Sequence, residues 1–150
     1  MRILKKNARA PLAIAVAVAT LLGTACSSTY TPAWAGKMMG YDLTGSAEVP
    51  PVSTKATGKS TIKVGDDRAV TGGITIEGMT ATAAHIHQGA KGANGPVVIP
   101  LTKSSDNAFT VPANTKMTDA QYAAFKAGNL YINVHSAANP NGEIRMQMKP

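Results

Sequence analysis

The chain reads Asn129-Leu130-Tyr131-Ile132-Asn133-Val134-His135 near its C-terminal end, followed by Asn139-Pro140-Asn141-Gly142 and then by residues 143–148. The first segment is rich in β-branched and aromatic residues, and Asn-Gly after such a run is a strong turn signal. We therefore predict an antiparallel hairpin in which residues 130–135 pair with residues 143–148. A hairpin here indicates a fold made of antiparallel strands.

Strand signals of the same kind continue through the preceding residues. Residues 60–64 and 70–76 alternate apolar and polar positions on either side of Asp66-Asp67-Arg68, which predicts a second hairpin with one buried face. Further short strands are expected at residues 41–49, 82–87, 96–101 and 107–111. With few aromatic residues in the chain, the core should be built from Ile, Val, Leu and Met.

One segment departs from this strand pattern. Residues 118–128 contain good helix formers, begin with Thr118 and Gln121 at capping-box spacing, and end at Gly128. We expect a single short helix there, covering one end of the core. The predicted fold class is all-β, an immunoglobulin-like/Greek-key β-sandwich or barrel with one short helix.

The N-terminal residues predict export. Residues 1–25 have a basic start and an apolar run at 12–22, as a secretory signal requires. Leu22-Gly23-Thr24-Ala25-Cys26 resembles a bacterial lipobox, which makes Cys26 the expected lipidation site of a lipoprotein. Cleavage after Ala33-Trp34-Ala35 is the rival interpretation. Cys26 is the only cysteine of the chain, so it has no intrachain disulfide partner, and lipidation would account for it.

These assignments divide the chain into three parts. Residues 1–25 are the expected signal, 26–40 the lipidated cysteine with a flexible tether, and 41–150 one domain. The expected location is the bacterial cell envelope, on a membrane surface. Four of the 15 basic residues precede Cys26, which leaves 11 basic and 8 acidic residues, a net charge of +3. This balance, without a basic run interleaved with aromatics, argues against nucleic acid as a partner.

The chain's three histidines are the main candidates for a functional site. His85 and His87 are two residues apart, so in a strand both imidazoles share one face, about 7 Å apart. His135 lies in another predicted strand, so we expect all three to converge on one place. Neutral imidazoles suit copper or zinc, and three histidines with an open position form a known type of metal site. The alternative is a polar cluster that holds loops together by hydrogen bonds.

Charged residues of the first and last predicted strands suggest a structural contact. Glu143 and Arg145 alternate on the last strand, and Glu48 meets Arg145 if the two strands are neighbours. We predict a buried pair between Arg145 and a carboxylate that fixes strand register. The alternative is a carboxylate that orients one of the histidine ligands.

Four motifs resemble the CHRD domain, named for its presence in chordin. They are residues 43–52, residues 83–89 with both histidines, residues 94–98, and residues 133–136 together with 139–145. The resemblance spans residues 41–148; in chordin the domain belongs to an extracellular antagonist of growth factors. The function we expect is a noncatalytic binding or structural module displayed at the membrane surface, with one copper or zinc ion at the histidines. The antagonist role of chordin itself is not carried over to a bacterial lipoprotein.

Two alternatives to a noncatalytic metal-binding module remain. His-x-His is similar to the copper-binding strand of Cu,Zn superoxide dismutases, which suggests a copper-dependent redox protein. However, the chain lacks that family's further histidines and disulfide cysteines, so dismutase activity is not expected. The other alternative is a protein or glycan interaction module without metal, with an exposed aromatic patch near Tyr30, Trp34 or Tyr41.

Overall fold

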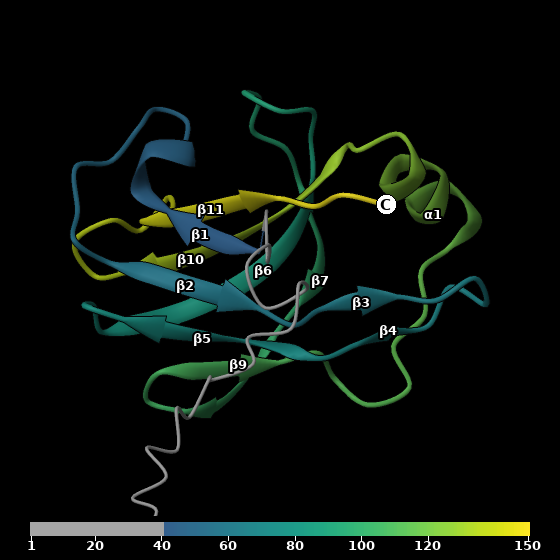
Figure 1. The fold of residues 1–150 in the computed structure, drawn as a ribbon, viewed down its shortest axis with the longest axis horizontal. Helices are drawn as coiled ribbons and strands as arrows, with labels where there is room; N and C mark the ends of the chain where they lie inside the picture. Colours follow the sequence, from purple (N-terminus) through teal and green to yellow (C-terminus); the bar gives the residue numbers. More distant parts are fainter. Residues whose placement is uncertain (1–40) are drawn as a thin grey trace, which may run out of the picture. The chain divides into compact units, whose positions relative to one another are not determined.

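Residues 41–150 are the part of the chain that the computed structural model describes (Figure 1). The strands are β1 (Asp42–Thr44), β2 (Thr57–Ser60), β3 (Lys63–Val64), β4 (Val70–Thr71), β5 (Gly73–Glu77), β6 (Ala81–Gln88), β7 (Val97–Pro100), β8 (Thr102–Ser105), β9 (Ala108–Thr110), β10 (Leu130–Ser136) and β11 (Ile144–Gln147). A 3-10 turn, η1 (Gly45–Ala47), and one helix, α1 (Asp119–Lys126), complete this part. The predictions for the signal at 1–25, Cys26, the tether, the cleavage after Ala35, Tyr30 and Trp34 lie outside the described residues.

Nine strands form one antiparallel sheet in the order β7-β6-β10-β11-β1-β2-β5-β9-β8. The two edge strands β7 and β8 follow each other directly in the chain, and they pair with β6 and β9 respectively. Between them, the Leu101 N–H donates to the Ala84 carbonyl of β6, at 3.0 Å. The sheet therefore curls into a nearly closed barrel (Figure 1), which confirms the predicted all-β fold with one short helix.

Both predicted hairpins form. In β10–β11, Tyr131 lies opposite Gln147 and Val134 opposite Ile144. The second hairpin is interrupted: β2 pairs with β5, and β3 with β4 in a separate two-stranded sheet. The break lies at Gly72, whose φ of +98° is a left-handed conformation that glycine adopts without strain.

The barrel interior is aliphatic, as expected. Side chains from β6, β10 and β11 that point inward alternate with polar ones that point outward, which is the period of a strand. The buried apolar residues of the long strands include Ala84, Ile86, Leu130, Ile132, Val134, Ile144 and Met146. The outward face of these three strands is consequently where the polar residues gather.

Helix α1 confirms the capping-box prediction. The Thr118 side chain accepts a hydrogen bond from the Gln121 N–H, and the Gln121 side chain accepts one from the Thr118 N–H. Phe125 is buried and Tyr122 packs on the core, so the helix covers part of the interior. Within residues 41–150, no helix has both the length and the apolar character needed to span a bilayer.

Two local features differ from the prediction. A strand was expected over residues 41–49, but β1 ends at Thr44, because the chain turns at Gly45 and the Val52 N–H returns to the Gly45 carbonyl at 2.9 Å. A Cβ at position 45 would lie 2.4 Å from the Val52 carbonyl oxygen, so this turn needs glycine. Strand β8 was not predicted, because all four of its residues are exposed and carry no apolar alternation.

Candidate metal site

Strand register assembles a polar face on the outside of β6, β10 and β11. His85 of β6 lies opposite Asn133 of β10, and His87 lies opposite Tyr131. Asn133 in turn lies opposite Arg145 of β11. Because these positions alternate with the buried apolar ones, their side chains share the face turned away from the core. The face carries His85, His87, Tyr131, Asn133, His135 and Arg145.

The three histidines converge, as the sequence predicted. One ligand nitrogen from each imidazole lies within 4.8 Å of the others. His85 Nδ1 and His135 Nε2 are 2.9 Å apart, and the His85 and His87 ring centroids are 5.5 Å apart. His87 is buried, whereas His85 and His135 are partly exposed. The cluster is thus open to solvent on the side of His85 and His135.

Backbone carbonyls orient two of the three rings. His87 Nδ1 lies 2.9 Å from the Gly95 carbonyl oxygen, and His135 Nδ1 lies 2.9 Å from the Pro140 carbonyl oxygen. A carbonyl only accepts, so each Nδ1 must carry the proton and each Nε2 must present a lone pair. The Nε2 of His87 is buried without a hydrogen-bond partner among the described residues. Carbonyls that fix the tautomer in this way are typical of histidine metal ligands.

The surroundings of His85 and His87 favour the neutral form of these two imidazoles. Burial lowers the pKa of His85, and the neighbouring His135 and His87 lower it further. Burial is also the main cause that lowers the pKa of His87, partly offset by its hydrogen bond to Gly95. Below the usual pKa of about 6.5 these two imidazoles therefore stay neutral longer than free histidine does. Neutral imidazole is the form that binds metal.

Tyr131 and Arg145 form a stack behind His87. The Tyr131 ring lies parallel to that of His87, with centroids 4.9 Å apart and 10° between the planes. On its other face lies Arg145, whose Cζ is 3.4 Å from the Tyr131 centroid, in cation–π geometry. The Tyr131 hydroxyl accepts a hydrogen bond from the Gly95 N–H at 3.1 Å. The same ring thus supports both His87 and the residue that orients it.

Arg145 also forms hydrogen bonds with the loop between β6 and β7. Its guanidinium donates to Asn94 Oδ1 at 3.1 Å, to the Ala93 carbonyl at 2.8 Å and to Gln147 Oε1 at 3.4 Å. These contacts hold the segment that delivers the Gly95 carbonyl to His87. Arg145 is only 1% exposed, so its charge lies inside the protein.

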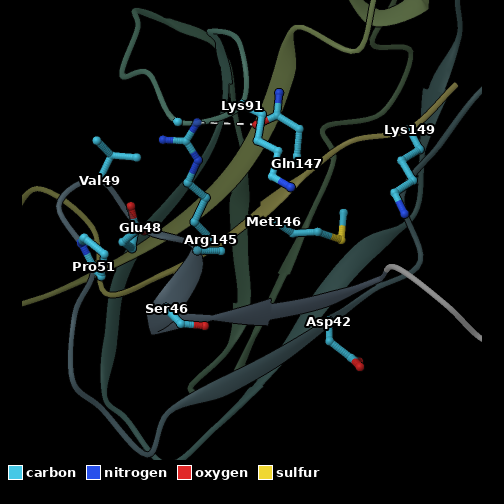
Figure 2. Close-up of a pocket in the computed structure, with 12 residues that line it drawn as sticks. Asp42, Ser46, Glu48, Val49, Pro51, Lys91, Arg145, Met146, Gln147 and Lys149 are labelled. Carbon is cyan, nitrogen blue, oxygen red and sulfur yellow. Dashed lines mark hydrogen bonds between the residues drawn. The ribbon is translucent and has the colours of Figure 1, made fainter.

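The predicted pair between Arg145 and a carboxylate is corrected by this geometry. The first and last strands are neighbours, with Thr44 opposite Arg145, but the guanidinium turns toward the loop rather than to Glu48 or Glu143. Glu48 and Arg145 line one pocket, whose volume is about 470 Å³. Figure 2 shows both side chains, with a dashed line for the hydrogen bond from Arg145 to Gln147. Burial lowers the pKa of Arg145, and Tyr131 and then Glu48 work to raise it.

Glu143 has a different role from the predicted one. It accepts hydrogen bonds from the hydroxyls of Thr54, at 2.7 Å, and Ser136. Burial works to raise its pKa, but hydrogen bonds from Ser136, Thr54 and Asn139 together bring the pKa below its ordinary value. Glu143 therefore fixes the end of the β10–β11 hairpin as a charged acceptor.

Ionisation of Glu48 should be visible in folding stability. Burial raises its pKa from 4.5 to about 6, against the lowering effect of the Arg145 charge. The folded domain thus holds this proton more tightly than the unfolded chain, and stability is lost as pH rises from 4.5 through 6. Glu48→Gln cannot ionise, so it should not lose this stability. The unfolding free energy of the variant minus that of the wild type should therefore rise by up to about 2 kcal/mol between pH 4 and pH 8.

Urea unfolding of both proteins at the two pH values measures this difference. The value at pH 4 serves as the internal control, because it contains every effect of the substitution other than charge. The same difference at both pH values would show that the pKa of Glu48 is not raised by folding.

Several contributors to the site were missed at the level of sequence. Tyr131, Asn133 and His135 occupy every second position of one strand, so the sequence could have predicted that their side chains share a face. Gly95 carried no such signal, since its contribution is a backbone carbonyl. Tyr41, proposed for an exposed aromatic patch, is indeed 47% exposed but lies outside this polar face.

Comparison with known proteins agrees with the motifs. The CHRD domain family matches residues 39–148, which include the three histidines, Gly95 and Arg145. No curated protein and no solved structure matches the chain. Since the family match covers well over half of the sequence and nearly all of the described residues, the chain belongs to the CHRD domain family.

Proposed function

We propose that this CHRD domain is a noncatalytic module that binds one copper or zinc ion through His85, His87 and His135. The observation that carries the proposal is the Nε2 of His87, a buried lone pair without a partner beside two further imidazoles. A buried polar atom without a partner costs folding free energy, typically about 1–3 kcal/mol. A metal ion at this point would remove that cost and use the tautomers that the two carbonyls select.

The donor geometry fits a first-row metal ion. The nitrogens that face one another are Nδ1 of His85 and Nε2 of His87 and His135. Zinc–nitrogen bonds of about 2.0–2.1 Å at tetrahedral angles place ligand nitrogens about 3.3 Å apart. The 2.9 Å separation between His85 and His135 would have to widen by a few tenths of an ångström, and the longer separations, of up to 4.8 Å, would have to close by about 1.5 Å through side-chain rotation.

The proposal extends to where the module works. A signal at residues 1–25 and lipidation of Cys26 would display the domain on a membrane surface of the bacterial envelope, with 26–40 as the tether. The family assignment supports a binding or structural role. The redox alternative requires a copper ion with an open position, and the solvent-exposed side of His85 and His135 would supply that position.

Metal content and affinity of the purified full chain test the proposal. All variants carry Cys26→Ser, because a thiolate is itself a metal ligand. Elemental analysis and calorimetric titration with Cu(II) and Zn(II) should give one equivalent bound, with affinity lowered at least about 100-fold in the His85→Ala, His87→Ala, His135→Ala triple variant.

The matched control is Gln88→Ala, an exposed neighbour on the same strand, which should keep full stoichiometry. Circular dichroism establishes that the triple variant is folded. Unchanged stoichiometry in that variant would remove the proposal. Absence of binding to the wild type would instead favour a protein or glycan interaction module without metal.

A further inference from the structure

A buried cation stands behind the proposed metal site, and the role inferred for it rests on the proposed function. Arg145, Tyr131 and His87 form a continuous stack with steps of 3.4 Å and 4.9 Å. Arg145 is 1% exposed, Tyr131 2% and His87 8%, so protein rather than water fills the path between the guanidinium and the imidazole. Charges separated by protein are screened much less than charges at a surface.

The hydrogen bonds of Arg145 do not neutralise its positive charge. Its acceptors are the side-chain amide oxygens of Asn94 and Gln147 and the backbone carbonyls of Ala90 and Ala93, all of them neutral. The ion pairs within residues 41–150 are Arg68–Asp119, Lys103–Asp106 and Lys116–Asp67, so no carboxylate there pairs with Arg145. Glu48 is a carboxylate that lines the same pocket as Arg145 without a direct bond to it.

The field of Arg145 reaches the histidines. The guanidinium Cζ of Arg145 lies 3.4 Å from the Tyr131 ring centroid, and the Tyr131 ring stacks on His87 with centroids 4.9 Å apart. A buried positive charge this close disfavours additional positive charge on a metal ion bound to His87. The three neutral imidazoles bring no negative charge to offset it.

We propose that Arg145, acting through Tyr131, makes the three-histidine site select copper in the cuprous state over divalent copper. Cu(I) carries one positive charge less than Cu(II) and accepts low coordination numbers with nitrogen ligands, which the trio of imidazoles provides. A unit charge separated from the metal site by the Tyr131 and His87 rings, in partly screened surroundings, changes the ratio of the Cu(I) and Cu(II) affinities about tenfold. Arg145 is thus a positioning and electrostatic residue, not a metal ligand.

The test measures two dissociation constants for the full chain in the Cys26→Ser background. Competition with a chromophoric Cu(I) chelator under anaerobic conditions gives one, and competition with a Cu(II) chelator in air gives the other. Each ion is supplied in its own oxidation state, so no electron transfer enters the comparison. The readout is the ratio of the Cu(II) to the Cu(I) dissociation constant.

Arg145→Met should lower this ratio about tenfold, while Arg145→Lys, which keeps the charge but loses the planar fork, should stay within about threefold of the wild type. Damage to the loop alone would weaken the binding of Cu(I) and Cu(II) alike and leave the ratio of their dissociation constants unchanged. The ratio therefore distinguishes the effect of the charge from structural damage, which a single dissociation constant would not.

Glu48→Gln provides a second variant in case Arg145→Met does not fold. Removal of the carboxylate that faces Arg145 leaves the guanidinium less compensated, so the ratio should rise above the wild-type value at pH 8. If Arg145→Met or Glu48→Gln binds both ions with an unchanged ratio, the inference is overturned while the metal site stands. If the wild type binds neither ion through its histidines, both proposals fail.

Discussion

Gly95→Ala is expected to lower the free energy of unfolding by about 3 kcal/mol or more, a loss typical of severe overpacking. A Cβ at position 95 would lie 1.7 Å from the carbonyl oxygen of Gln88, which is backbone and cannot rotate away. The two segments are held at this separation by the hydrogen bond from the Gln88 N–H to the Pro96 carbonyl, at 3.0 Å. Any side chain at position 95 must therefore push the loop off β6.

The same displacement should weaken metal binding. The Gly95 carbonyl accepts the Nδ1 proton of His87 and its N–H donates to the Tyr131 hydroxyl, so moving the loop releases both rings. We expect metal affinity to fall about 10- to 100-fold, the usual effect of losing a group that orients a ligand. Urea unfolding and calorimetric titration measure the two effects on one protein preparation.

Gly92→Ala is the matched control from the same loop. A Cβ there meets nothing within 4 Å, although the φ of +82° imposes a strain of about 1 kcal/mol on alanine. Its metal affinity should be that of the wild type. If Gly95→Ala cost no more stability than Gly92→Ala, the close approach of the loop to β6 would be refuted.

The sequence predicted the strands where periodicity and turn chemistry agree. Residues 130–135 and 143–148 alternate and flank Asn141-Gly142, so the β10–β11 hairpin followed from local information. Strand β8 has four exposed residues, and the closure of the barrel depends on the pairing of β6 with β10 and of β5 with β9, which lie far apart in the sequence. Such pairing leaves no local signal.

The same division holds for the site. Convergence of His85, His87 and His135 followed from period two and from the expectation that their strands lie in one sheet. The direction of the Arg145 side chain did not follow, because its partner Asn94 is 51 residues away and lies in a loop. Charge complementarity suggested a carboxylate partner, whereas the structure satisfies the guanidinium with neutral oxygens and an aromatic face.

Binding of copper or zinc is expected to stabilise the domain strongly. An ion that binds only the folded protein adds about 2.7 kcal/mol of stability at a free concentration 100 times its dissociation constant. For a domain of this size, that gain corresponds to a rise in Tm of about 10 °C. Because Nε2 of His87 is buried in the folded domain, occupation of this site requires the native packing of β6 against β10.

Differential scanning calorimetry of the Cys26→Ser protein, with and without Zn(II), measures the rise in Tm. Zinc keeps one oxidation state, which excludes oxidative damage as a cause of any change. His135→Ala is the informative variant, since it leaves His85 and His87 as a local pair that the unfolded chain also presents. If the ion needs the ligand from β10, His135→Ala abolishes most of the rise; a rise that persists in this variant would show that the folded domain holds the ion without His135.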